Sequence, residues 1–407
     1  MVIGMKKLQA FKFKLKPSAK QRKKLARFAG CTRLVFNKAL ALQMELWEKG
    51  EKKLSYAALC KKVTEWRNSD DFSFLADAPA QPLQQSMKDL DRTYENFFAG
   101  RASLPRFKKR GNRDSFRYPQ PEQFKLDEKN NRIFLPKLGW MQYRNSRNVC
   151  GAPKQISVSR SADGWYVSIQ TEQEVNPKQP VSDSAVGIDL GVSRFATLSD
   201  GNLYVAPNVF RKSEKKLAMA QRKLSRKKKF SANWRKQAWK VRKMHKVISD
   251  IRRDFLHKVS TIVCKNHAVV VIEDLYVKGM SASASGTMEK PGTRVKAKSG
   301  LNKAILDQGW GAFRRFLDYK LAWLGGTLVV VPAKNTSKSC SACGFCCPEN
   351  RKSQAIFDCV KCGHKENADL NAAKNILAAG RAVIACGEKA LAISMKQEPT
   401  VSSISVA

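Results

Sequence analysis

The chain has 407 residues, 43% of them hydrophobic, which is enough for two to three domains with buried cores. Its 76 Lys and Arg against 34 Asp and Glu give a formal net charge of +42, far more than solubility requires, and indicate a polyanionic partner. No window approaches 18 consecutive apolar residues, and lysines interrupt the first apolar positions, which argues against a spanning helix or a signal peptide. We therefore expect a cytoplasmic protein that binds nucleic acid and no membrane.

The N-terminal part predicts one strand followed by a helical module. Residues 10–16, AFKFKLK, alternate apolar and basic side chains at the period of a half-buried strand, which Pro17 and Ser18 end. From residue 19 to about 98 the pattern is helical, and QPLQQSMKDLDRTYENFF at 81–98 places apolar residues along one stripe.

The next region predicts a basic loop and then two pairs of strands. Residues 104–118 interleave aromatic and basic side chains, which suits base stacking beside phosphate contacts but also an ordinary solvated loop. Residues 124–136 and 156–175 alternate in polarity around Asn-Asn and Asp-Gly turn signals, which predicts a small antiparallel barrel or sheet that the first strand completes. The basic residues of the loop that we expect to contact nucleic acid are Arg106, Lys108 and Lys109.

The middle of the chain predicts a linker at 176–184, a strand, a tight turn and a second strand, with Asp189 near the end of the first strand. Residues 211–246 then hold sixteen Lys or Arg and one acid at helical spacing. Such runs are usually solvated surface helices, but sixteen like charges repel one another, which favours a polyanion ligand. The expected contacts are Arg222, Lys223, Arg226, Lys227, Lys228 and Lys229.

This basic run is expected to continue as an amphipathic helix. Its apolar side comprises Val241, Met244, Ile248, Ile251, Phe255, Val259 and Ile262. Residues 267–275, HAVVVIEDL, then predict a central strand covered on both faces, with Glu273 at its end.

The remaining elements are a mobile loop at 277–300, a helix striped from Leu306 to Leu324, and a second buried strand, GTLVVVPA. After the cysteine-rich segment, DLNAAKNILAAG predicts a helix that begins near Asp369. The polar residues 396–407 are expected to fray.

The strongest local motif is a pair of C-x2-C knuckles separated by fifteen residues. Four thiolates at this spacing can occupy the corners of a tetrahedron, which is the geometry of structural Zn2+. The expected ligands are Cys340, Cys343, Cys359 and Cys362. Cys346 and Cys347 offer a rival register, because Cys343 and Cys346 also form C-x2-C.

Three carboxylates form a second constellation. Asp189 and Glu273 end strands and Asp369 opens a helix, so the three can converge on two Mg2+ ions that activate water for phosphodiester hydrolysis. Each acid also has an ordinary explanation: a turn residue, a surface residue paired with lysine, and a helix N-cap. Spacing alone leaves both interpretations open.

Several motifs in fixed order resemble the TnpB family, RNA-guided nucleases carried by transposons and related to the type V CRISPR effectors. They are GIDLG at 187–191, QRKLSRKKK at 221–229, VVIEDL at 270–275, DQGW at 307–310, SKSCSACG at 337–344 and ADLNAAKNI at 368–376, with AFKFKLKPS and the helix around 80–92 at the N-terminal side. The resemblance covers nearly the whole chain.

The resemblance implies an α/β multidomain architecture. It consists of a wedge β-barrel at 1–18 and 99–180, a helical recognition domain at 19–98, an RNase H-like RuvC nuclease domain at 181–337 and 365–395, an inserted zinc ribbon that binds target nucleic acid at 338–364, and a tail at 396–407. Asp189, Glu273 and Asp369 match the family's catalytic acids.

The implied activity is cleavage of double-stranded DNA beside a short target-adjacent motif, directed by a guide RNA from the transposon end and carried out by a monomer bound to that RNA. Gln84 falls where the family's recognition helix touches this motif. Two alternatives are an RNA-guided repressor that binds DNA without cutting, against which all three acids argue, and a transposase, since the fold also serves transposition.

Overall fold

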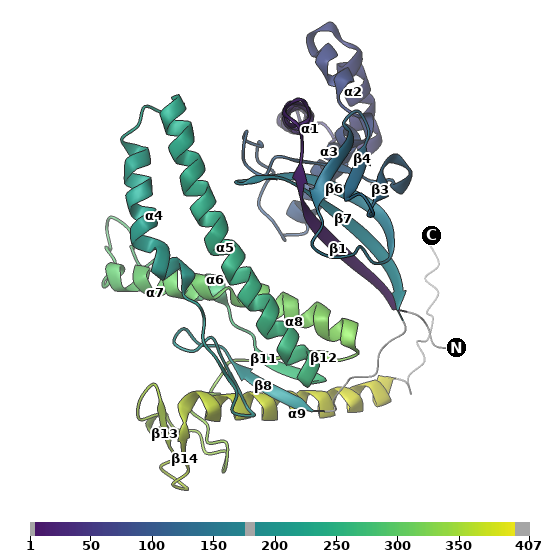
Figure 1. The fold of residues 1–407 in the computed structure, drawn as a ribbon. Helices are drawn as coiled ribbons and strands as arrows, with labels where there is room; N and C mark the ends of the chain where they lie inside the picture. Colours follow the sequence, from purple (N-terminus) through teal and green to yellow (C-terminus); the bar gives the residue numbers. More distant parts are fainter. Residues whose placement is uncertain (1–4, 176–183, 395–407) are drawn as a thin grey trace, which may run out of the picture. The chain divides into compact units, whose positions relative to one another are not determined.

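The computed structural model describes residues 5–175 and 184–394, and the chain divides into two compact units, residues 1–176 and 177–407 (Figure 1). The predicted linker at 176–184, apart from Ser184, and the predicted tail at 396–407 lie outside the described residues. Among the helices of the described part, none has the length and apolarity to cross a bilayer.

The N-terminal unit contains an antiparallel seven-stranded sheet in the order β2-β6-β7-β1-β5-β4-β3. The first strand joins this sheet, as expected; it lies in the middle of the strand order and buries Phe11, Phe13 and Leu15 on one face. The two turn signals correspond to the hairpins β3–β4 and β6–β7. The strands are β1 (Met5–Lys16), β2 (Ser115–Tyr118), β3 (Lys125–Asp127), β4 (Arg132–Leu135), β5 (Gly139–Arg144), β6 (Ala152–Ser161) and β7 (Gly164–Val175).

The predicted helical module follows β1. It comprises α1 (Ala19–Glu48), α2 (Tyr56–Asn68), the short 3-10 helix η1 (Asp70–Asp77) and α3 (Ala80–Phe98). Ser18 ends β1 and caps α1 through a capping box with Gln21, because its side chain accepts the Gln21 backbone N–H. The apolar stripe of α3 is buried at Leu83, Met87, Leu90 and Tyr94, whereas Phe98 is exposed.

The C-terminal unit is built on a five-stranded sheet in the order β10-β9-β8-β11-β12. Strands β8, β11 and β12 are parallel, and β9 and β10 extend the sheet in antiparallel pairing. The strand predicted to be central, β11, lies between β8 and β12. The bounds are β8 (Ala185–Asp189), β9 (Ala196–Leu198), β10 (Leu203–Tyr204), β11 (Val269–Glu273) and β12 (Thr327–Val331).

Helices cover both faces of this sheet (Figure 1). Ile188 and Ile272 pack in one core with residues of α5 (Ala232–Asn266) and α8 (Trp310–Leu324), while Val271 packs with α9 (Ala368–Ser394) on the other face. The approach of α9 is close, since a Cβ on Gly187 would lie 2.2 Å from the Ala373 carbonyl oxygen. The glycine of GIDLG therefore lets the helix lie directly on β8.

The basic run does not form one continuous helix. It divides into α4 (Val209–Ser225) and α5, which pack side by side as a hairpin with its tip at residues 226–231 (Figure 1). The single apolar stripe predicted on α5 is also partly wrong, because Ile251 and Ile262 are exposed. One part of α5 packs on α4 and another part packs on the sheet and α8, so the buried face changes along the helix.

The loop and helix predicted after β11 need two corrections. The loop at 277–300 is helical at both ends, in α6 (Val277–Met280) and the start of α7 (Val295–Gln308). Leu306 belongs to α7 and is exposed, because Gly309 adopts a left-handed φ of 74° and separates α7 from α8.

Candidate functional site

Asp189 and Glu273 end neighbouring parallel strands, β8 and β11, at the same edge of the sheet. Neighbouring strands are about 4.8 Å apart, so acids in adjacent positions are close. Side chains alternate between the two faces of a strand. Gly187 and Val271, two positions before each acid, both lie against α9, so the two carboxylates are on the α9 side of the sheet.

Asp369 is the second residue of α9, which lies on that same face. The side-chain oxygen of Asn367 accepts the backbone N–H of Asp369 at 3.1 Å and that of Leu370 at 3.4 Å. Asn367 is therefore the cap of the helix, and the ordinary explanation of Asp369 as an N-cap is wrong. The three acids named from the sequence meet at the junction of β8, β11 and α9.

The charges of Glu273 and Asp369 both act on the carboxyl group of Asp189. Burial raises the pKa of Asp189 to about 7, with further contributions from the charges of Glu273 and Asp369 and an opposing one from Arg351. Glu273 is 9% exposed, and its burial raises its pKa as well. The Thr336 hydroxyl donates a hydrogen bond to its Oε1 at 2.5 Å, which favours the charged form.

Two arginines accompany the acids, and the sequence patterns did not identify either of them. Arg194, in the turn after β8, lies 3.9 Å from the Asp369 carboxylate and donates to Asn367 Oδ1 at 3.1 Å. Arg351, in the cysteine-rich segment, lies 3.7 Å from the other Asp369 oxygen. Neither residue belongs to a local motif that signals its position, because each reaches the site through tertiary folding.

The donor set of this site suits a hard cation. It offers carboxylate oxygens, the ligands that Mg2+ prefers, and their mutual repulsion is what a bound divalent ion relieves. Among the described residues, the one group of three or more potential metal ligands with closely spaced donor atoms is a set of four cysteines. The three acids do not form such a group. The arginine pairs and the Thr336 hydrogen bond supply the compensating contacts.

The four cysteines of the two knuckles form a tight cluster. Their sulfur atoms all lie within 4.8 Å of one another, and the pairs Cys340–Cys362 and Cys343–Cys359 are each 3.7 Å apart. With a Zn–S bond of about 2.3 Å, a tetrahedron has S···S edges of about 3.8 Å, so the donors fit Zn2+. Cys346 lies outside the cluster, so the rival register is wrong.

Each knuckle closes with the same turn, which explains why both read C-x-x-C-G. Gly344 and Gly363, which follow the second cysteine of each knuckle, adopt left-handed φ values of 74° and 72°. Asn350, fully buried, ties the knuckles together: its amide donates to the Phe345 carbonyl at 3.0 Å and its oxygen accepts the Val360 N–H at 3.0 Å.

Two asparagines of α9 attach this cysteine ribbon to the acid site. Asn371, fully buried, donates to the Ser339 carbonyl at 2.8 Å and accepts the Ser341 N–H at 2.9 Å. Asn375 donates to the carbonyls of Ser339 and Thr336 at 2.7 and 2.8 Å. Because the Thr336 hydroxyl also holds Glu273, the ribbon, the helix and the acid site form one hydrogen-bonded assembly.

The residues expected to contact nucleic acid lie in three places: on α3, in the loop before β2, and at the end of α4 with the hairpin tip. Gln84 is half-buried on α3, and Arg106 and Lys109 are exposed in the loop before β2. The ammonium of Lys108 lies 3.7 Å from the centre of the Phe36 ring, so this lysine already has a partner within the protein. The six basic residues of the run are on the final turns of α4 and at the hairpin tip; they are Arg222, Lys223, Arg226, Lys227, Lys228 and Lys229.

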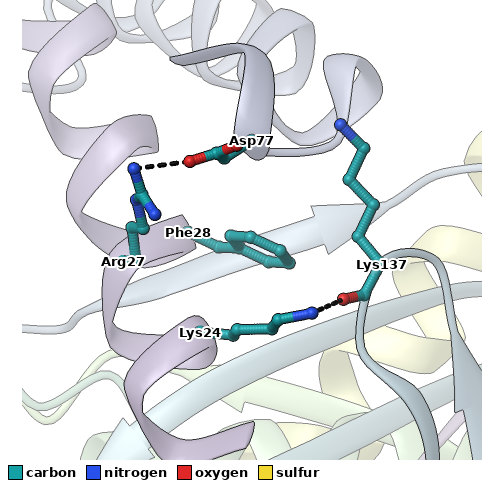
Figure 2. A pocket seen from close by; sticks show the side chains of 5 residues that line it. All are labelled: Lys24, Arg27, Phe28, Asp77 and Lys137. Atoms are coloured by element: carbon teal, nitrogen blue, oxygen red, sulfur yellow. Dashed lines mark hydrogen bonds and ion pairs between the residues drawn. The ribbon is translucent and has the colours of Figure 1, made fainter. Parts of the chain in front are cut away.

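A basic pocket of about 360 Å3 opens in the N-terminal unit (Figure 2). Its cations have protein partners: Lys24 donates to the Lys137 carbonyl at 3.1 Å, Arg27 pairs with Asp77 at 2.5 Å, and Lys137 donates to the Ala76 carbonyl at 2.6 Å. We interpret the pocket as a brace between α1, η1 and the β4–β5 turn.

Three family models match the chain. A helix-turn-helix domain matches residues 5–52, which form β1 and α1 here; a probable transposase matches residues 168–284; and a Cas12f1-like TNB domain matches residues 310–376. The last two ranges together contain all three acids and all four clustered cysteines.

Two curated relatives match over nearly their whole length. A protein of Escherichia coli (strain K12), named "Putative RNA-guided DNA endonuclease InsQ", is 55% identical and covers 97% of this chain and 98% of its own. A protein of Streptomyces pristinaespiralis, named "Putative RNA-guided DNA endonuclease", is 37% identical, with 93% and 91% covered. The solved structure of a Cas12f1-sgRNA-target DNA complex has the same fold at a TM-score of 0.54 and 13% identity, over 92% of this chain and 98% of that one.

Proposed function

Since the chain belongs to the TnpB family, we propose that it is an RNA-guided endonuclease that cleaves double-stranded DNA by Mg2+-dependent phosphodiester hydrolysis. The observation that carries the proposal is the position of Asp189, Glu273 and Asp369 at one end of the sheet, where the charges of Glu273 and Asp369 both raise the pKa of Asp189. Placing like charges this near one another costs stability, so acids with no role beyond packing would not be expected to gather here.

The side chains have distinct roles in this proposal. Asp189, Glu273 and Asp369 hold the metal ions, which when bound activate water and stabilise the leaving oxygen. Thr336 orients the Glu273 carboxylate through its hydrogen bond. Arg194 and Arg351 offset the negative charge of the acids, and guanidinium groups at this site can pair with an anionic phosphodiester.

The finer architecture forms part of the proposal. The parallel strands with acids at their ends, covered by helices on both faces, support an RNase H-like, RuvC-type nuclease domain at 181–337 and 365–395. The sheet of the N-terminal unit supports a wedge domain at 1–18 and 99–180, with the recognition helices 19–98 between its parts. The protein acts as a monomer on its RNA, and Gln84 of α3 approaches the target-adjacent motif.

Guide RNA and target DNA are the proposed partners, and the basic residues named above are their proposed contacts. The names of the relatives support this assignment, and so does the charge of +42. The ribbon at 338–364 holds structural Zn2+ in the proposal and positions Arg351 beside Asp369. The protein works in the bacterial cytoplasm, on the nucleoid when bound to DNA.

Plasmid cleavage tests the function. Purified protein with its co-purified RNA should cut a plasmid that matches the guide, only with Mg2+, and Glu273→Gln should abolish cutting. Asp274→Asn is the matched control: Asp274 is the next residue, is exposed, and pairs with Arg314 at 2.7 Å at the surface. It should cut at the wild-type rate.

Three outcomes would contradict this proposal or favour a different function. Cutting that ignores the guide would remove the RNA from the mechanism. DNA occupancy with equal cellular function of wild type and Asp189→Ala would instead indicate a repressor. Strand-transfer products formed without RNA would indicate a transposase.

Zinc content tests the ribbon. Cys340→Ser should lose zinc and unfold the ribbon, because one ligand of a closed site carries much of its folding energy. Cys346→Ser, outside the cluster, should keep both zinc and activity. Full zinc content in Cys340→Ser would contradict the assignment.

A further inference from the structure

The tip of the α4–α5 hairpin carries an exposed aromatic pair whose role the nuclease chemistry does not explain. The Phe230 side chain is 71% exposed, and its ring centre lies 5.5 Å from that of the half-buried Trp234 at an interplanar angle of 54°. Apolar surface that stays exposed to water at the end of a hairpin adds little to the stability of the fold. The pair therefore does not contribute to the core.

The backbone at Phe230 is the second observation. Its φ is 66°, in the left-handed region where a residue with a bulky side chain is rare and where glycine is the default. The turn is held on both sides: Ser231 donates its N–H to the Lys228 carbonyl at 3.2 Å, and its side chain caps α5 by accepting the Trp234 N–H at 3.1 Å. A bulky ring at a strained backbone position is the kind of outlier that points to a use for the ring itself.

The charge around the pair limits the class of partner. From residue 215 to residue 249 the sequence contains no Asp or Glu, and four consecutive cations, Arg226 to Lys229, lead directly to Phe230. Basic groups beside an exposed ring match the two parts of a nucleotide, since cations pair with phosphates and every base has a face that stacks on an aromatic ring. An apolar protein partner would not need the cations.

We propose that Phe230 and Trp234 form a stacking site for an unpaired nucleobase, whose flanking phosphates contact Arg226 to Lys229. Guide RNA is the expected source of the base, in which respect the inference rests on the proposed function. A base of displaced single-stranded DNA has the same chemistry.

Binding of the full-length protein to a short labelled single-stranded RNA, and to DNA of the same sequence, tests the site. Phe230→Gly removes the ring and the strain together. It should bind about tenfold more weakly at every salt concentration, with an unchanged salt slope, because stacking releases no counterions. Its unfolding temperature should not fall, because glycine accepts the left-handed backbone.

Two matched variants separate the ring from the charge. Phe230→Tyr keeps a ring and should bind as the wild type does, whereas Lys228→Ala keeps the ring and should show a shallower salt slope. An RNA of abasic nucleotides should bind the wild type and Phe230→Gly equally. Loss of affinity in Phe230→Gly for the RNA alone identifies guide RNA as the source of the base, and loss for the DNA alone identifies the displaced strand. An equal loss for both shows a stacking site that accepts either.

Wild-type affinity of Phe230→Gly for both RNA and DNA would overturn the inference. The result is distinguishable from a failure of the nuclease proposal. Ring-dependent binding without plasmid cleavage would remove only the proposed function, and guided cleavage with ring-independent binding would remove only the stacking site.

Discussion

Asp189 has a pKa near 7 in the folded protein, against an ordinary value of 3.8. Between these two values the folded state holds a proton that the unfolded chain has released. The free energy of unfolding of the metal-free protein should therefore fall as the pH rises from about 4 to about 7, by at most about 1.4 kcal/mol per pH unit from this group, and level off above.

Denaturant unfolding of wild type and Asp189→Asn across this range measures the contribution. As the pH rises, the free energy of unfolding of the wild type should fall relative to that of Asp189→Asn. Added Mg2+ should bring back the stability that the wild type loses near pH 7. Parallel stability curves would show that the Asp189 carboxyl is not held in a repulsive site.

The Thr336 hydroxyl donates a hydrogen bond that favours the charged form of Glu273 and opposes the effect of burial on its pKa. Thr336→Val removes the donor while keeping the shape, so the pKa of Glu273 should rise further and the acid limb of the cleavage rate profile should move to higher pH. A charge-assisted hydrogen bond is worth about 1.5–3 kcal/mol, so the rate at neutral pH should fall at least about tenfold. Thr336→Ser should restore both; an unshifted profile in Thr336→Val would contradict this role.

At the scale of elements, the distance between α9 and the sheet depends on Gly187. Gly187→Ala would bring a Cβ to 2.2 Å from the Ala373 carbonyl and 2.6 Å from the Leu377 N, both backbone atoms that cannot rotate away. We expect a loss of stability of about 1–3 kcal/mol and a larger loss of cleavage, because the shift of α9 moves Asp369.

Gly300→Ala is the matched control, because nothing lies within 4 Å of its Cβ and it sits inside α7. It should be neutral or stabilise by up to about 1 kcal/mol. Thermal unfolding and cleavage rates of both variants test the pair. Wild-type cleavage in Gly187→Ala would show that α9 tolerates displacement.

The strand that ends in Glu273 and the two cysteine knuckles were predictable from the sequence because each signal is local. A continuous apolar strand ending in Glu273 and two C-x-x-C-G knuckles carry their own geometry. The break in the basic run was not predictable, since lysine and arginine favour a helix and the break uses Phe230 in a conformation normally marked by glycine. Arg194 and Arg351 were missed because only the folded chain brings them to Asp369.

On the scale of the whole molecule, a net charge of +42 makes the protein without nucleic acid a self-repelling object. Its guide RNA should raise the unfolding temperature, since a ligand at a hundred times its dissociation constant adds about 2.7 kcal/mol. The gain should shrink as salt screens the contacts. Thermal unfolding with and without RNA at low and high salt measures it, and an equal gain at both would contradict an electrostatic origin.

Asn371 and Asn375 bind only main-chain groups of the ribbon and of Thr336 just before it: the carbonyls of Thr336 and Ser339 and the N–H of Ser341. Every peptide offers those groups, so these hydrogen bonds do not depend on the side chains at Ser339 and Ser341, whereas the Phe357 ring of the ribbon packs against Ala368 of α9. A chimaera that carries the ribbon of a relative, with an arginine kept at the position of Arg351, should fold and cut. Cleavage by such a chimaera would show that the geometry of the acid site does not depend on most side chains of the ribbon.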